Sequence, residues 1–182
     1  MRKIGCLIFL FSFNTVIAQR FVVKQGEISF ASHAELELIK ATSPKLAGII
    51  DAANNQLVFK VDNRSFNGFN SGLQREHFNE KYIESEKFPA SSFKGKIIEK
   101  VDFSANGSYD IRVKGELDIH GQIQIRIIKG KITIRDNVVF IETTFNVPLA
   151  DHNISIPKIV SQKIATEIEV YLTATLMPNT GG

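Results

Sequence analysis

Short segments in which apolar and polar residues alternate run through most of this chain. The clearest begins at Tyr109, where Ile111, Val113, Leu117 and Ile119 fall on the same face and charged side chains occupy the other. A period of two residues is typical of a β-strand with one buried face. Similar patterns predict strands over residues 27–32, 36–40, 45–50, 57–62, 93–100, 123–127, 131–135, 138–145 and 167–176.

Turn residues separate these segments at fairly even spacing. Asn106-Gly107 is a strong hairpin signal, Thr42-Ser43-Pro44 interrupts the chain, and Gln25-Gly26 and Lys129-Gly130 are interpreted as further breaks. Neither a repeat nor a linker is evident. We therefore expect one all-β domain over residues 20–178, built as a sandwich or an up-and-down antiparallel barrel of about eight strands.

The stretch from Phe66 to Lys94 does not alternate. Its sequence is FNGFNSGLQREHFNEKYIESEKFPASSFK, in which Leu73 precedes His77, and Phe78 precedes Tyr82, by four residues. That spacing predicts one to three helical turns. A short helical or looped insert in a β-barrel is where a lid or plug would lie.

The first eighteen residues have the pattern of a secretory signal peptide. Arg2 and Lys3 form a positive start, residues 4–13 are mostly apolar, and Val16-Ile17-Ala18 resembles a cleavage site before Gln19. The apolar run is shorter than the roughly 20 residues of a membrane span. We therefore expect a bacterial protein that is periplasmic or secreted after cleavage of residues 1–18.

The single cysteine, Cys6, lies inside this leader, so the mature chain is expected to have no disulfide, lipid anchor or other stable membrane anchor. Loss of Arg2 and Lys3 lowers the formal charge from +3 to +1. A nearly neutral chain is not typical of nucleic-acid-binding proteins. A monomer and a homodimer both remain open as assemblies.

Catalytic and metal motifs are weak. The histidines, His33, His77, His120 and His152, show no metal-binding spacing, and residues 68–72 (GFNSG) lack the spacing of a nucleophile elbow. We therefore predict no catalytic residue, metal or cofactor. His120 ends a strong strand and His152 lies in a loop, so the two could meet at one rim.

The inward faces of the strands carry long rows of isoleucine, valine, leucine and phenylalanine. A barrel of about eight strands can be filled by such side chains or can hold one small ligand. Composition alone favours the filled barrel. A hydrocarbon chain in an apolar tunnel is the sharper hypothesis, and periodicity does not separate the two.

Three groups of residues resemble the YceI-like family of lipid- and polyisoprenoid-binding periplasmic proteins. The first is Leu73–Phe78 with Tyr82-Ile83, Ser85–Pro89 and Phe93–Gly95. The second, Val113–Gly121, is similar to the family pattern V-x-G-x-L-x-x-H-G. The third is Phe145–Ile154, followed by a final strand over residues 164–176.

The resemblance implies an extended, lipocalin-like antiparallel β-barrel that sequesters or carries a polyisoprenoid or similar long apolar chain and is not an enzyme. Phe66, Phe69, Leu73, Phe78, Tyr82 and Phe88 would then lie near the tunnel mouth. Wall residues would be Phe59, Phe93, Ile111, Val113, Ile125 and Leu172. The chain departs from the family after Gly121, where Gln122-Ile123-Gln124-Ile125 replaces smaller residues, and inward isoleucines would narrow the tunnel.

Two other functions remain open. One is an exported lipid- or quinone-modifying enzyme or stress protein that uses His77, His120 or His152. The other is a barrel with a filled core that binds a partner protein.

Overall fold

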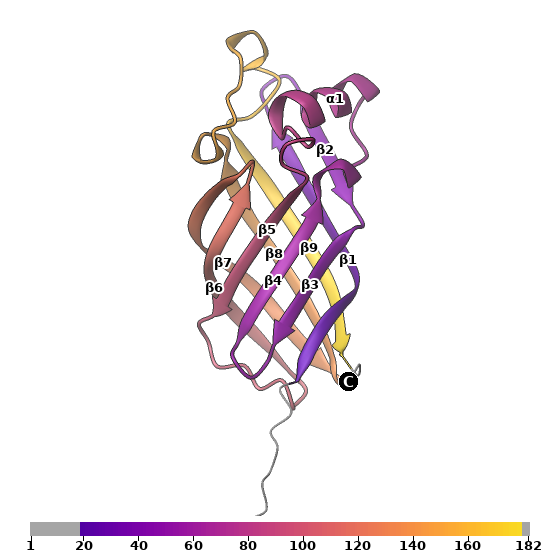
Figure 1. The fold of residues 1–182 in the computed structure, drawn as a ribbon, viewed down its shortest axis with the longest axis vertical. Coiled ribbons are helices and arrows are strands. Elements are labelled where there is room, and N and C mark those ends of the chain that lie inside the picture. The colour runs from indigo at the N-terminus through magenta and orange to yellow at the C-terminus, as the bar shows by residue number, and fades with distance from the viewer. Residues whose placement is uncertain (1–18, 180–182) are drawn as a thin grey trace, which may run out of the picture.

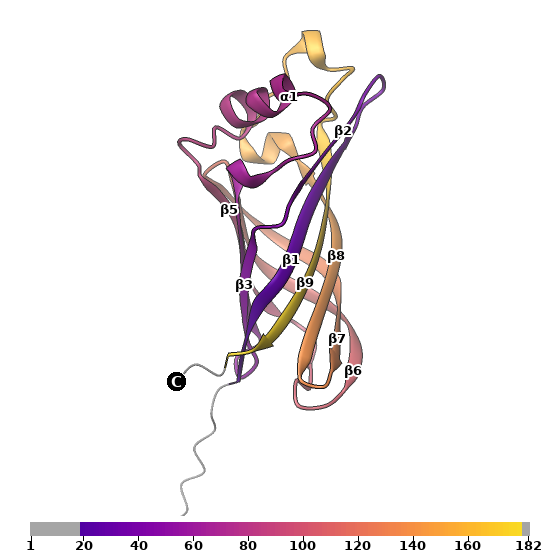
Figure 2. The same ribbon diagram turned by 90° about the vertical axis from the view of Figure 1, so that its right-hand side faces the viewer.

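The structure is a computed structural model that describes residues 19–179, so the expected leader lies outside the described residues. Within these residues nine strands form one antiparallel sheet in the order β2-β1-β3-β4-β5-β6-β7-β8-β9, and β9 also pairs with β1 to close the barrel (Figures 1 and 2). Their bounds are β1 Arg20–His33, β2 Leu38–Ser43, β3 Leu46–Asp51, β4 Gln56–Asp62, β5 Ala90–Ile97, β6 Gly107–Ile119, β7 Gln122–Arg135, β8 Val138–Pro148 and β9 Glu167–Pro178.

The strands β2 and β3 share one position in the barrel. The strand β2 pairs with the second half of β1, from Ile28 to His33, and β3 pairs with its start, from Arg20 to Val22. Pro44 lies in the break between them, where its missing N–H does not interrupt a ladder. The result is a closed eight-stranded barrel, which confirms the predicted fold class.

The predicted helical insert is present between β4 and β5 and covers one end of the barrel (Figure 1). We call residues 63–89 the insert. It contains the 3-10 turn η1 Asn63–Ser65, the helix α1 Gly72–His77 and the π-helical turn η2 Phe78–Tyr82. Ser71 caps α1, because its hydroxyl accepts a hydrogen bond from the Gln74 backbone N–H at 3.2 Å. Two more 3-10 turns, η3 Leu149–His152 and η4 Lys158–Val160, lie between β8 and β9.

Two predicted breaks lie inside strands and were therefore wrong. The Gln25-Gly26 pair lies within β1, where the register with β9 shifts between Val23 and Gln25. A bulge absorbs one extra residue without ending a strand, so a glycine there need not mark a turn. Gly130 lies within β7, where a Cβ would come within 2.9 Å of the Glu142 carbonyl oxygen, so it marks a close approach to β8.

The barrel is packed solid at the end opposite the insert. The side chains of Phe21, Ile50, Ile132, Val139 and Leu176 are completely buried there. The rings of Phe21 and Phe103 lie 5.6 Å apart and help to fill this end. The described chain therefore has a closed end, where both β1 begins and β9 ends, and an opposite end under the insert, which we call the mouth. Within residues 19–179, no helix is both long and apolar enough to cross a membrane.

Candidate functional site

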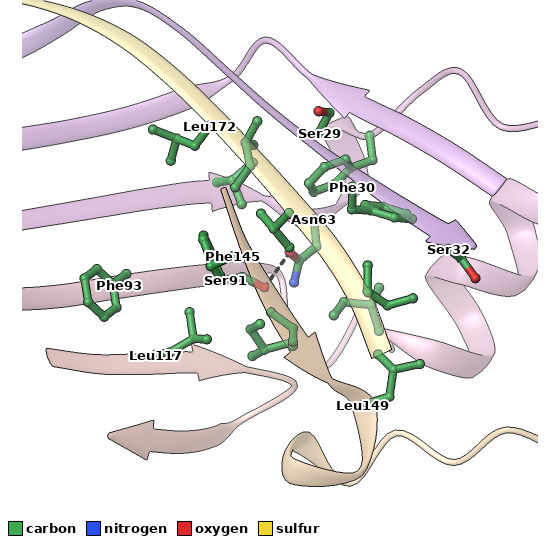
Figure 3. Close-up of a pocket in the computed structure, with 18 of the residues that line it drawn as sticks. Ser29, Phe30, Ser32, Asn63, Ser91, Phe93, Leu117, Phe145, Leu149 and Leu172 are labelled. Atoms are coloured by element: carbon green, nitrogen blue, oxygen red, sulfur yellow. Dashed lines mark hydrogen bonds between the residues drawn. The ribbon is translucent and has the colours of Figure 1, made fainter. Parts of the chain in front are cut away.

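A cavity of about 410 Å³ lies in the mouth half of the barrel, above the packed core (Figure 3). Every strand contributes to its lining, because inward side chains recur at every second residue. Its walls are almost entirely apolar. They include Ile28, Phe30, Ile39, Leu46, Phe59, Val61, Phe93, Ile111, Val113, Leu117, Ile128, Ile141, Phe145, Val147, Val170 and Leu172.

Four phenylalanines roof this cavity. Phe30 comes from β1, whereas Phe66, Phe69 and Phe78 come from the insert, and all four line the cavity. Their ring centroids are 5.2 to 6.0 Å apart in tilted, stacked and edge-on arrangements. Aromatic pairs at such distances are favourable beyond the area they bury. The cluster therefore fixes the insert against β1 while its lower surface faces the cavity.

Hydrogen bonds hold the insert to β2 and hold its two ends together. Asn67 and Thr42 of β2 exchange two backbone hydrogen bonds of 2.7 and 2.9 Å. Asn63, the first residue of the insert, donates its backbone N–H to Pro89 O at 2.9 Å and its side-chain amide to Phe88 O at 2.8 Å. These contacts satisfy the polar backbone of a segment that crosses the mouth without a sheet of its own.

A histidine holds the far side of the insert to the barrel rim. The His120 ring lies between two acceptors: Nδ1 donates to the His152 carbonyl at 3.0 Å, and Nε2 is 2.5 Å from Glu84 Oε2. The Phe88 ring packs edge-on against the imidazole at 4.6 Å. The prediction that His120 and His152 meet at one rim is confirmed. Their contact joins the β6–β7 turn, η3 and the insert.

His152 is fully buried, and its Nδ1 donates to the Gln122 carbonyl at 3.0 Å. Its Nε2 has no hydrogen-bond partner among the described residues. His77 lines the cavity instead and takes no part in the hydrogen bonds of these two histidines. Within residues 19–179, no three histidine, cysteine, aspartate or glutamate side chains are placed to hold a metal ion.

The polar side chains on the cavity wall are few. Ser91 donates to Asn63 Oδ1 at 2.9 Å, and this pair lies on the cavity wall where the insert joins β4 and β5 (Figure 3). Nearer the mouth, the Gln74 amide donates to Glu37 at 2.5 Å. Burial raises the pKa of the Tyr82 hydroxyl still further above physiological pH, at which a tyrosine is already neutral. A largely apolar cavity with a few polar groups near one end suits an amphiphilic ligand.

Nine of the twelve residues selected from the sequence line the cavity, and their contact with a ligand stays a prediction. They are Phe59, Phe66, Phe69, Phe78, Tyr82, Phe93, Ile111, Val113 and Leu172. Leu73 is on the outer side of α1 and is 59% exposed. Phe88 packs on His120 rather than lining the cavity. Ile125 is 62% exposed on the outside of β7, so its placement in the wall was wrong.

The error at Ile125 has a physical cause. Ile125 pairs with Glu116, and Ile123 with Asp118, so the isoleucines of this half of β7 share the outer face with charged residues. The polar residues of β7 turn inward, where Gln124 donates to Asp151 O at 2.7 Å and Arg126 donates to Asn146 O at 2.9 Å. These bonds hold η3 and the end of β8. The isoleucines therefore do not narrow the cavity.

Sequence reasoning missed several lining residues. Leu117 lies on the apolar face predicted for its strand but was not selected for the wall, and Phe145 could have been found from the alternation of β8. Asn63 and Ser91 could not have been found from the sequence pattern, because their positions in the cavity wall follow from η1 and from the pairing of β4 with β5. Ile154 and Ile164 reach the cavity from the irregular segment between β8 and β9, which has no periodicity to read.

Comparison with known proteins identifies relatives of this fold. The family model described as a YceI-like domain matches residues 19–176. Among solved structures, a polyisoprenoid binding domain from Saccharophagus degradans implicated in plant cell wall breakdown is 12% identical, with a TM-score of 0.74 over 87% of this chain and 98% of that one.

Two further structures are similar. BcnA from Burkholderia cenocepacia is 13% identical, with a TM-score of 0.68 over 82% of this chain and 95% of that one. The Campylobacter jejuni YCEI protein is 12% identical, with a TM-score of 0.55 over 99% of this chain and 94% of that one. At these identities the likeness establishes the fold. No curated protein matches this chain.

Proposed function

This chain belongs to the YceI-like domain family, and from that membership we propose that it binds a polyisoprenoid or similar long apolar chain inside its barrel. The observation that carries the proposal is the apolar cavity of about 410 Å³ between the packed core and the insert. A structural relative with the same fold is named as a polyisoprenoid binding domain.

Burial of the hydrocarbon would supply the affinity. Removing apolar surface from water contributes about 25 cal/mol per Å² and needs no directional partner. The walls offer rows of aliphatic and aromatic side chains, and the Asn63–Ser91 pair and the Gln74–Glu37 pair are polar groups toward the mouth. We propose that the polar end of the ligand lies near the insert and that its chain points toward the closed end.

The proposed role is to carry or sequester the lipid without changing it. His120 and His152 use ring nitrogens to bond backbone carbonyls and Glu84, which supports a structural role for both side chains. The leader pattern of residues 1–18 supports export to the periplasm or the medium. Export would place the protein where it can meet membrane lipids.

Native mass spectrometry followed by organic extraction tests the proposal. Protein purified from its own host should carry an isoprenoid or acyl mass that is released on denaturation. Phe69→Asp places a carboxylate in the aromatic roof and should reduce the bound fraction at least tenfold, since an unpaired charge is costly in an apolar site.

Leu73→Asp is the matched control, because Leu73 lies on the same insert but does not line the cavity. It should keep the ligand of the unmodified protein. A chain that carries no extractable lipid, and binds none when incubated with polyprenols or fatty acids, would exclude the proposed function.

A further inference from the structure

The mouth of the barrel carries an unusually exposed apolar tip. We call residues 157–164, which include η4, the η4 tip. Ile159 at its centre is 92% exposed, more than any other exposed large hydrophobic side chain among the described residues. Figure 2 shows this tip projecting beyond the strands and the insert. Full exposure of an isoleucine on a projecting turn is unfavourable for a side chain that meets only water.

The η4 tip is also part of the cavity wall. Val160, Lys163 and Ile164 line the cavity, although Ile159 on the same turn faces solvent. The tip therefore joins the apolar interior to the outermost apolar side chain within a few residues. A surface that buried Ile159 would lie directly beside the mouth.

A second exposed apolar side chain lies next to the tip. Leu36, in the turn between β1 and β2, is 64% exposed, and its backbone N–H donates to Gln162 O at 2.8 Å. Ser32 reinforces this contact, because its hydroxyl accepts a hydrogen bond from the Ala165 backbone N–H at 2.9 Å. Two loops with apolar tips are thus held together at the mouth.

The charges around Ile159 are positive. Lys158 precedes it within η4, Lys163 follows four residues later in the tip, and the η4 tip contains no acidic residue. Around Leu36 the charges are negative, from Glu35 and Glu37, but Glu37 accepts hydrogen bonds from Gln74 and Asn70. Charge complementarity at Ile159 therefore favours an anionic partner, with the tip as the first point of contact.

We propose that the η4 tip and the β1–β2 turn dock the mouth on the surface of an anionic lipid bilayer, with Ile159 inserted among the lipids. This inference rests on the proposed function, because it gives a carried lipid a path from bilayer to cavity without crossing water. Apolar side chains beside lysines are typical of protein segments that lie in a membrane interface.

The isoleucines on the outside of β7 provide a comparison. Ile125 is 62% exposed, but it pairs with Glu116 and does not line the cavity. If exposed apolar surface alone caused binding to the bilayer, the outer face of β7 would bind it as well as the η4 tip does. The proposal requires the tip, because the tip combines an almost fully exposed isoleucine, two lysines and continuity with the cavity, whereas Ile125 has no such continuity.

The test is co-flotation of a chain beginning at Gln19, which keeps every strand, with phosphatidylcholine vesicles that contain or lack phosphatidylglycerol. The unmodified chain should float with the anionic vesicles and less with the neutral ones. Ile159→Asp should lower the partition coefficient by roughly tenfold or more. Lys158→Glu should lower it as well, and added salt should weaken binding.

Ile125→Asp is the matched control, because it makes the same chemical change at a similarly exposed isoleucine. It should leave partitioning within about twofold of the unmodified chain, since its flank does not meet the bilayer. Circular dichroism should show that all variants retain the barrel. Equal losses in Ile125→Asp and Ile159→Asp, or a capture of the unmodified chain by a protein partner with no vesicle binding, would overturn the proposal.

Organic extraction of the same preparations keeps the two hypotheses apart. Lipid in the cavity without vesicle binding would refute only the docking proposal. Vesicle binding through Ile159 with an empty cavity would support the docking proposal and refute the proposed carrier function.

Discussion

Gly115 and Gly95 face each other across β5 and β6, where the two strands come close together. A Cβ at Gly115 would lie 2.3 Å from Lys94 O and 2.6 Å from the Gly95 Cα. Both are backbone atoms that cannot rotate away. We therefore expect Gly115→Ala to lower the free energy of unfolding by about 1–3 kcal/mol.

Gly72→Ala is the control for that measurement. Gly72 begins α1, and a Cβ there would meet no atom within 4 Å. Alanine favours helix and restricts the unfolded chain, so this variant should gain about 0.4–1 kcal/mol. Denaturant unfolding monitored by circular dichroism compares the two. Equal effects would show that the close approach of β5 and β6 is not what requires glycine.

The contact between His120 and Glu84 is a second prediction at the scale of single residues. A buried hydrogen bond to a charged group contributes about 1.5–3 kcal/mol, but the Glu84 side chain is 41% exposed, so screening by solvent lowers the contribution below this range. A double-mutant cycle with His120→Ala and Glu84→Ala should give a coupling free energy of about 1 kcal/mol.

The same cycle distinguishes structure from catalysis at His120. If this residue only holds the insert, removing it should speed hydrogen exchange in residues 83–89 and leave ligand mass unchanged. A chemically altered lipid in the unmodified protein that disappears in His120→Ala would instead favour the enzymatic alternative.

At the scale of elements, β7 shows that the alternation of apolar and polar residues predicts a strand but not which face of the strand is buried. The period of two residues correctly indicated a strand, yet it does not state which face is inside. Tyr109–Ile119 buries its apolar row, whereas Ile123, Ile125 and Ile127 expose theirs. The difference arises from η3 and β8, whose carbonyls require the inward Gln124 and Arg126. Local periodicity does not predict a requirement of this kind, because the carbonyls belong to segments distant in sequence from β7.

Aspartate substitutions measure this difference between the two faces. Val113→Asp would bury an unpaired carboxylate among the core residues of β6, at a cost of several kcal/mol that would prevent stable folding. Ile125→Asp should lower the free energy of unfolding by only about 1 kcal/mol, because the side chain is exposed and the cost is limited to the poor strand propensity of aspartate and its position opposite Glu116. Thermal unfolding of both variants checks this. A strongly destabilised Ile125→Asp would mean that β7 is inverted relative to the present structure.

The insert is the second element whose behaviour follows from a few contacts. Phe78 touches Phe30, Phe66 and Phe69, and it holds α1 over the cavity. Phe78→Ala should release α1 and η2 without opening the sheet, because the strands do not depend on this ring. We expect amide exchange to rise over residues 72–83 while β6 and β9 stay protected. Uniformly faster exchange would contradict an insert that opens on its own.

At the scale of the whole molecule, the strand pattern and the family resemblance together predicted a closed antiparallel barrel with an insert at one end. The size of the cavity was not predictable, because it depends on how far the inward side chains of facing strands reach. Phe21, Phe103 and Leu176 meet and fill one end, whereas Leu117, Phe145 and Ile128 leave space at the other. Side-chain lengths alone do not distinguish these two halves.

The closed end has a consequence for topology. Asn179 N donates to Arg20 O at 2.7 Å, and Phe21 pairs with Pro178, so the two ends of the barrel chain lie together, far from the insert. A short glycine-rich linker could join them, and the chain could be cut instead at the β3–β4 turn. Such a circular permutant should fold to the same barrel, and a protein tethered to a support at either original end should present its mouth to solution.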